Sequence, residues 1–164
     1  MPLTVFIPLA ALASLGAIVM VTRRNPISSA LALTVSLIAI AGLFAGLSAH
    51  FLFAIQLLVY AGAIMVLVIF VIMLLNLREK DLKMEGLNLT RGIAAGAAGL
   101  VIFAALARLF ARARVALPPV AADFGEALPV SRLLFSEYII PFEIVSLVLL
   151  VAIVGAVVVA KRHF

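Results

Sequence analysis

The segment Phe51–Leu75 runs for 25 residues without a charged side chain. About 20 apolar residues at a rise of about 1.5 Å each cross the roughly 30 Å hydrocarbon core of a bilayer, so this segment predicts a membrane-spanning helix. Its first half also carries Gln56, Tyr60 and Gly62. A hydroxyl in hydrocarbon needs a partner, and a glycine weakens the helix while letting another backbone or water approach. We therefore expect this helix to do more than anchor the chain.

Four further apolar segments accompany it, and the five together hold about two-thirds of the 164 residues. The chain is 67% hydrophobic and only 12% charged, which lies far outside the composition of soluble domains. The sequence predicts an all-α integral membrane protein, a single membrane domain over residues 1–164 with five transmembrane helices. The predicted spans are Leu3–Thr22, Ile27–Leu47, Phe51–Leu75, Gly92–Phe110 and Ile139–Ala160.

The segments between the spans leave no room for a soluble domain. The longest, Ala111–Tyr138, is broken by prolines and is too short for its own hydrophobic core. Because it is amphipathic, we expect it to lie along the outer membrane surface or against a neighbouring subunit. The segment Arg78–Arg91 alternates positive and negative side chains, which is typical of a solvated loop. Chemistry that needs a nucleotide or a metal cluster is therefore expected on another chain.

The basic residues flank the spans instead of forming one stripe, so the net charge of +5 indicates membrane topology and not nucleic-acid binding. The bias predicts an external N-terminus and a cytoplasmic C-terminus. No Lys or Arg precedes the first apolar run, so we expect a retained first span and not a cleaved signal peptide. The predicted cytoplasmic side receives Arg23, Arg24, Arg78, Lys80, Lys83, Arg91, Lys161 and Arg162, and the other side receives Arg108, Arg112, Arg114 and Arg132.

Ionisable residues are missing from the interior of every predicted span. Arg108 and Glu143 lie within a turn of a span end, His50 borders the third span, and cysteine is absent. Proton and ion carriers keep ionisable groups at membrane depth, so a self-contained pump is not expected. Glu143 follows Pro141 near the start of the fifth span, where the helix amino end stabilises a carboxylate by about 0.3–1 kcal/mol. The alternative is a carboxylate at the edge of a polar pathway built with partner subunits.

Small residues predict where helices approach closely. The pairs Gly42 with Gly46 and Gly92 with Gly96 have the four-residue spacing that allows close contact in lipid. The fourth span is dominated by alanine and glycine, so we expect it to pack between helices, either of this chain or of other subunits. Two methionines of the third span, Met65 and Met73, are expected to fill gaps in the core.

Tyr60 lies roughly 13 Å inside the third span, which is too deep for an interfacial anchor. One interpretation is a hydroxyl that bonds a neighbouring helix. The other is that Tyr60 and the adjacent Ala61-Gly62-Ala63 mark a helix distortion that can rearrange.

The run from Leu58 to Leu67, continued by Phe70 to Asn76, resembles the third span of subunit J of respiratory complex I, the proton-translocating NADH:quinone oxidoreductase. Its mitochondrial counterpart is subunit 6. Leu134-Phe135, Tyr138 and Pro141-Phe142-Glu143 resemble the approach to the family's fifth span, and Asn25-Pro26 resembles the start of its second span. The resemblance covers the first three spans and the last.

This resemblance implies a subunit of the membrane arm in the bacterial inner membrane, near the quinone-reducing end. It implies that this chain has no catalytic site and binds no cofactor, while NADH, FMN, iron–sulfur clusters and quinone belong to other subunits. The partners implied are other membrane-arm subunits and the lipid bilayer, without nucleic acid. In the family the third helix carries a π-bulge near the position of Tyr60, whose rearrangement opens or closes a water path. The positions carried over are Tyr60, Gly62, Met65 and Val66 for coupling, with Glu143 in a polar pathway.

The first hypothesis is therefore a non-catalytic subunit that couples quinone reduction to proton translocation. A stand-alone transporter is the second, and it would need a deep ionisable group or a broken-helix substrate site. The third is a subunit of a related membrane hydrogenase or antiporter complex, which co-purifying chains would distinguish from the first.

Overall fold

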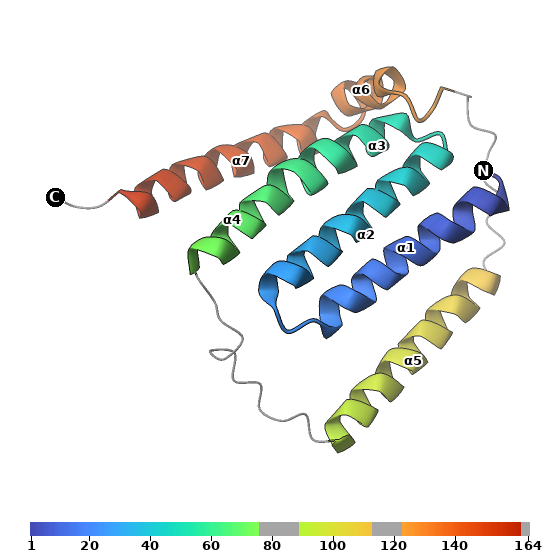
Figure 1. The fold of residues 1–164 in the computed structure, drawn as a ribbon. Helices are drawn as coiled ribbons and strands as arrows, with labels where there is room; N and C mark the ends of the chain where they lie inside the picture. The colour runs from blue at the N-terminus through green and yellow to red at the C-terminus, as the bar shows by residue number, and fades with distance from the viewer. Residues whose placement is uncertain (76–88, 113–122, 162–164) are drawn as a thin grey trace.

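Helices make up nearly all of the computed structural model, which describes residues 1–75, 89–112 and 123–161 (Figure 1). Five helical segments are long and apolar enough to cross a membrane, which confirms the prediction of an all-α chain with five candidate spans. The third is a continuous 26-residue helix, His50–Leu75, formed by α3, η1 and α4. The elements are α1 Leu3–Thr22, α2 Pro26–Gly46, α3 His50–Ile55, η1 Gln56–Ile64, α4 Met65–Leu75, α5 Leu89–Arg112, α6 Ala127–Ser136 and α7 Ile139–Ala160.

The turn between α1 and α2 is set by a capping residue followed by proline. The Asn25 side chain accepts hydrogen bonds from the backbone N–H groups of Ile27 at 2.9 Å and Ser28 at 3.3 Å. Pro26 occupies the first helical position, where its missing N–H costs nothing and its fixed φ suits a helix. These two residues explain why α2 begins at the position where the sequence Asn25-Pro26 stands.

The helices α1 and α2 form a tightly packed hairpin. A Cβ at Gly16 would lie 3.0 Å from the Ala32 carbonyl oxygen, so the two backbones nearly touch there. The Ser36 hydroxyl donates to the Ala13 carbonyl oxygen at 2.8 Å and bonds the helices together. Gly42 does lie against α1, as its spacing predicted, although its neighbour is the Leu9 side chain.

The third span packs along α2, so that the two helices of the hairpin and the third span lie side by side (Figure 1). The buried core is small and formed mainly by alanines of α2, with Met65 of α4 buried to 2% exposure. The prediction that Met65 fills a gap is therefore confirmed. The same prediction for Met73 is wrong for this chain, because its side chain is 59% exposed.

The amphipathic segment before the last span contains the short helix α6 at the α3 end of the bundle (Figure 1). It connects directly to α7, and the rings of Phe135 and Phe142 pack edge-on at a centroid distance of 5.0 Å. Residues 113–122 of this segment lie outside the described residues, as do most of the segment Arg78–Arg91 and the C-terminal Arg162 and His163. The orientation of the chain across the membrane stays a prediction.

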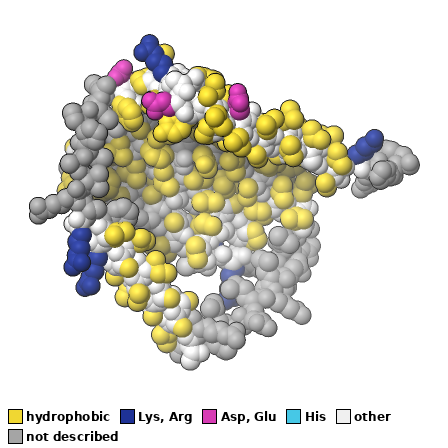
Figure 2. All heavy atoms as spheres, turned by 180° about the vertical axis from the view of Figure 1, so that it is seen from behind, with side chains coloured by type: hydrophobic (Ala, Val, Ile, Leu, Met, Phe, Trp, Pro, Cys, Tyr) yellow, Lys and Arg dark blue, Asp and Glu magenta, His cyan; other side chains and the backbone are white. Residues whose placement is uncertain are grey.

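Two spans have no helical neighbour along their length in the described part of the chain. There, α5 contacts no other helix and α7 contacts only α6. A Cβ at Gly92, Gly96 or Gly99 of α5 would enter open space. Packing of the fourth span within its own chain is therefore not observed among the described helices. On the face shown in Figure 2 the described side chains are mostly apolar, and most of the Lys, Arg, Asp and Glu side chains lie towards its edges.

Candidate functional site

The third span changes its helical geometry in the middle. It begins as the α-helix α3, continues as the nine-residue π-helix η1, Gln56–Ile64, and ends as the α-helix α4. At the junction the Met65 N–H donates to the carbonyl oxygen of Tyr60, five residues earlier, and to that of Gly62. Hydrogen bonds over five residues define the π-helix, which is rare, mostly a single turn long, and often found at functional sites. This stretch is the most unusual backbone feature of the described chain.

Gly62 favours the π geometry through a close backbone contact. A Cβ on this residue would lie 3.1 Å from the Leu57 carbonyl oxygen, five residues earlier, and this is tighter than most Cβ contacts. A larger residue would require that carbonyl group to shift. Because glycine also disfavours the α-helix by about 1 kcal/mol relative to alanine, it lowers the advantage of the regular helix over the π-helix.

The π-helix brings Gln56 and Met65 to the same side of the span. Gln56 is 8% exposed and Met65 is 2% exposed, and α2 is the helix that packs on both η1 and α4. Nine residues of a regular α-helix turn through about 900°, or about two and a half turns, which would place these side chains on opposite faces. Burial of both residues against α2 therefore depends on the wider π turns between them.

Two of the predicted coupling residues point away from this packed face. Tyr60 is 47% exposed and Val66 is 64% exposed. Among the described residues no hydrogen bond joins the Tyr60 hydroxyl to another helix, so the interpretation of Tyr60 as a bonded side chain is not supported within this chain. The structure thus separates the predicted residues into Met65 on the α2 side, Gly62 within the backbone distortion, and Tyr60 and Val66 on the outer side. Their role in coupling stays a prediction.

Glu143 lies apart from the π-helix. It is the fifth residue of α7, and the part of the chain that is described shows α7 packed only against α6. The expected stabilisation by the helix amino end is wrong, because α7 has no acidic residue in its first turn and the effect of the helix dipole fades beyond that turn. The side chain is exposed on this chain. A contribution to a polar pathway would therefore have to involve neighbouring subunits.

Gln56 was not singled out as a site residue from the sequence, although it is the chain's single glutamine. It is one of two buried polar residues in the described core, the other being Ser36. The available signal was a polar amide inside an uncharged 25-residue span, since polar groups at membrane depth are costly. Sequence periodicity could not have shown that it shares a face with Met65.

The start of the third span is tied to the segment that precedes α6. The Phe51 N–H donates to the Gly125 carbonyl oxygen at 3.0 Å, and His50 Nε2 lies 3.8 Å from a carboxylate oxygen of Glu126. Ser48, in the turn before α3, has a positive φ of 60°. A Cβ on Gly125 would collide with the Ser48 carbonyl oxygen, so this contact requires glycine. The start of the third span is therefore held in place while its middle is distorted.

The described residues contain no group of three His, Cys, Asp or Glu side chains that could hold a metal ion. The candidate site is thus a backbone and packing feature and not a cluster of reactive side chains. Its main elements are the π-helix of the third span and the packing of that span along α2.

Comparison with known proteins identifies relatives of the whole chain. The sequence profile of the family described as NADH-ubiquinone/plastoquinone oxidoreductase chain 6 matches residues 16–159. NADH-quinone oxidoreductase subunit J of Pseudomonas aeruginosa is 37% identical over 151 residues, covering 90% of this chain and 89% of the relative. Subunit J of Escherichia coli K12 is 34% identical, with coverage of 93% and 83%. NAD(P)H-quinone oxidoreductase subunit 6 of the Paulinella chromatophora chromatophore is 36% identical, with coverage of 96% and 77%.

Proposed function

Because the chain belongs to the family of NADH-ubiquinone/plastoquinone oxidoreductase chain 6, we propose that it couples quinone reduction to proton translocation in an NADH:quinone oxidoreductase. The resemblance seen in the third span is confirmed over the whole chain by the family profile and the relatives. The single observation that carries the coupling role is the nine-residue π-helix in the middle of the third span.

The proposed coupling element is a helix with two registers. In the π form Gln56 and Met65 both lie against α2. Conversion of η1 to a regular α-helix would turn one of these side chains away from α2 by about half a turn, because the α-helix advances about 100° per residue. A partner that binds one register better than the other shifts the equilibrium between them. In this way a partner subunit that responds to quinone reduction would change which of Met65 and Gln56 lies against α2.

The proton path itself is assigned to partner subunits. Residues 51–75 contain no Asp, Glu, Lys, Arg or His, so the switching helix has no group that carries a proton. Tyr60 and Val66 face away from α2, where a neighbouring helix or a water path would meet them. Glu143 contributes to a polar pathway only together with such neighbours. In this proposal the chain has no catalytic site, and NADH, FMN, iron–sulfur clusters and quinone are bound by other subunits.

The unpaired spans support a place inside a multi-subunit membrane arm. The fourth span exposes Gly92, Gly96 and Gly99 in open space. Small residues allow the backbones of membrane helices to approach closely. We assign these surfaces to other membrane-arm subunits in the bacterial inner membrane, with the N-terminus outside and the C-terminus in the cytoplasm.

The coupling role is tested by Gly62→Ala in the intact complex, with Gly155→Ala as the matched control. Both changes favour the α-helix by about 1 kcal/mol, but only the first adds a Cβ next to a carbonyl oxygen within a π-helix. We expect Gly62→Ala to shift the register equilibrium about fivefold towards the α form. Proton pumping and quinone-linked NADH oxidation should fall by a similar factor, while NADH oxidation by an artificial acceptor at the flavin should not change.

The control variant should keep all three activities. Equal coupled activity in Gly62→Ala and the unmodified complex would contradict the proposal, as would an equal loss in Gly155→Ala. Proton transport by liposomes that contain this chain alone would instead favour a stand-alone transporter.

A further inference from the structure

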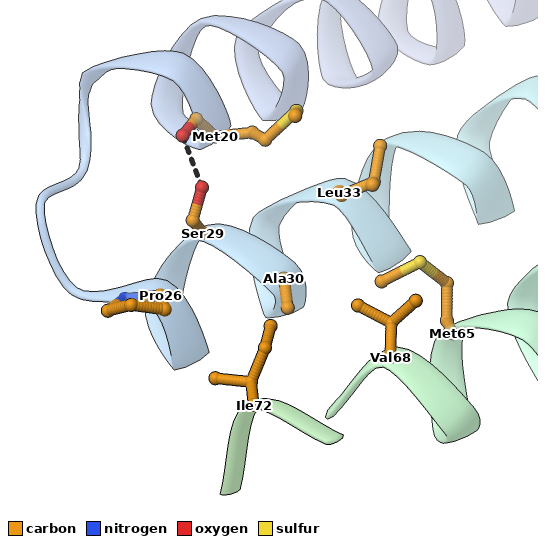
Figure 3. Close-up of a pocket in the computed structure, with 8 residues that line it drawn as sticks. All are labelled: Met20, Pro26, Ser29, Ala30, Leu33, Met65, Val68 and Ile72. Carbon is orange, nitrogen blue, oxygen red and sulfur yellow. Dashed lines mark hydrogen bonds between the residues drawn. The ribbon is translucent and has the colours of Figure 1, made fainter. Parts of the chain in front are cut away.

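An apolar groove of about 240 Å³ lies between α2 and α4, next to the turn that joins α1 to α2 (Figure 3). The Ser29 hydroxyl, the polar side-chain group in its lining, donates a hydrogen bond to the Met20 carbonyl oxygen (Figure 3). The groove thus offers hydrocarbon contacts and little that would bind a polar ring. Its lining residues are Met20, Pro26, Ser29, Ala30, Leu33, Met65, Val68 and Ile72.

The dimensions of the groove suit one flexible chain. The lining residues of α4 extend from Met65 to Ile72, which corresponds to about 10 Å along a helix. A helix has a diameter of about 10–12 Å with its side chains and cannot enter a space of this volume. Met65 and Met20 are flexible side chains that adapt to an irregular apolar occupant.

Positive charge lies at the end of the groove. Arg23 and Arg24 occupy the turn between α1 and α2, and both are exposed. Arg24 is two residues from Pro26, so the two Cα atoms lie within about 7.6 Å of each other. Residues 1–75 contain no Asp or Glu, and the three packed spans therefore carry nothing that offsets this charge.

We propose that this groove binds one acyl chain of an anionic phospholipid, whose phosphate is held by Arg23 and Arg24. Arginine presents paired N–H donors that match phosphate oxygens, and basic residues at the ends of membrane helices recognise anionic headgroups. The apolar lining would contact the acyl chain of the lipid, and the two arginines would bind its phosphate. Because Met65 lines the groove and directly follows the π-helix, the bound chain contacts the side of the span that the π geometry turns towards α2.

The test uses the intact complex in mild detergent and a photoactivatable acyl chain. Phosphatidylglycerol and phosphatidylcholine with the same diazirine-bearing chain are cross-linked separately, and the modified residues are mapped by mass spectrometry. We expect cross-links in residues 30–33 and 65–72, about thirtyfold stronger with phosphatidylglycerol, since each of the two arginines contributes about 1 kcal/mol to binding of the anionic headgroup.

Variants separate the headgroup contact from the hydrocarbon contact. Arg23→Gln with Arg24→Gln should reduce phosphatidylglycerol labelling to the phosphatidylcholine level, and the corresponding double lysine variant should retain most of it. Val68→Trp should reduce labelling by both lipids. Lys161→Gln, which removes a basic residue after α7, should leave labelling unchanged.

Several outcomes would overturn this assignment. Equal labelling by the two lipids would exclude recognition of an anionic headgroup, and an absence of cross-links from both segments would exclude the groove as a lipid site. A side chain of a neighbouring subunit found inside the groove would exclude it as well. If the double glutamine variant does not assemble, the ratio of labelling by phosphatidylglycerol to labelling by phosphatidylcholine in the unmodified complex tests the headgroup contact.

Discussion

The helix α2 packs against α1 on one side and against the third span on another, and these two contacts differ in kind. The hairpin brings two backbones into contact at Gly16 and is joined across the helices by Ser36. The third span packs along α2 with Gln56 and Met65 buried, and its central nine residues leave the α-helical geometry. In the proposed account the first region stays fixed at this backbone contact, whereas the second changes register.

In the coupling role that we propose, the two regions have different tasks. A register change needs a fixed reference surface, and α2 provides it because α1 holds it from the other side. In this proposal η1 is the distortion that a register change of the third span would relieve. Stability and switching are thus expected to depend on different glycines.

The largest effect is expected at Gly16. Valine at this position would push against the Ala32 carbonyl oxygen and the Ser36 Cβ, each 3.0 Å from the added Cβ, and backbone cannot move away as a flexible side chain can. Overpacking of this kind costs about 3 kcal/mol. The free energy of unfolding of the full chain in detergent, measured by denaturant titration, should fall by that amount. Gly155→Val, where the new side chain enters open space, should change it little; equal losses would show that the hairpin is not a specially close contact.

A smaller loss is expected where the segment before α6 meets the start of the third span. Gly125→Ala places a Cβ against the Ser48 carbonyl oxygen and should weaken the bond between Phe51 and Gly125. We expect a destabilisation of about 2 kcal/mol. Hydrogen exchange of the Phe51 amide should accelerate, while amides in the hairpin keep their protection. Unchanged exchange at Phe51 would mean that this end of the third span is not held by the segment before α6.

A change at Gln56 is expected to affect proton pumping and not folding. In Gln56→Leu the cost of moving this side chain away from α2 into hydrocarbon disappears, so the α register gains about 1 kcal/mol relative to the π register. Proton pumping of the intact complex should fall about fivefold, with assembly unaffected. The conservative variant Gln56→Asn should lose less, and full pumping by Gln56→Leu would argue against a role for this amide.

The smallest effect is expected for the pair of His50 and Glu126. Both side chains are about half exposed, and exposed pairs of this kind contribute at most about 1 kcal/mol, often less. His50→Ala should therefore leave both the unfolding free energy and the pumping rate nearly unchanged. A loss as large as that of Gly125→Ala would show that this pair contributes to holding the third span.

The five spans could be predicted because hydrocarbon imposes a length and an apolar composition that the sequence displays directly. The start of α2 could be predicted for a similar reason, since Asn25 and Pro26 act on the backbone next to them. These features depend on local chemistry or on the bilayer as a solvent.

The faces of the helices were harder to predict. Met73 and Met65 look alike in sequence, yet only Met65 meets α2, because which face is buried depends on a neighbouring helix. The length of η1 could not be predicted from composition, and regular helical periodicity places Gln56 and Met65 on opposite sides. The position of Glu143 near the start of α7 was predicted correctly, but it lies beyond the first turn, where the helix amino end would have stabilised its carboxylate.

Structures of the intact complex at rest and during steady-state turnover test the central claim most directly. We expect one population in which Gln56–Ile64 is a π-helix with Met65 against α2, and a second in which this segment is α-helical and one of the two side chains has turned away. The hairpin should superpose in both. An identical π-helix in every population, while the complex pumps protons, would contradict the account.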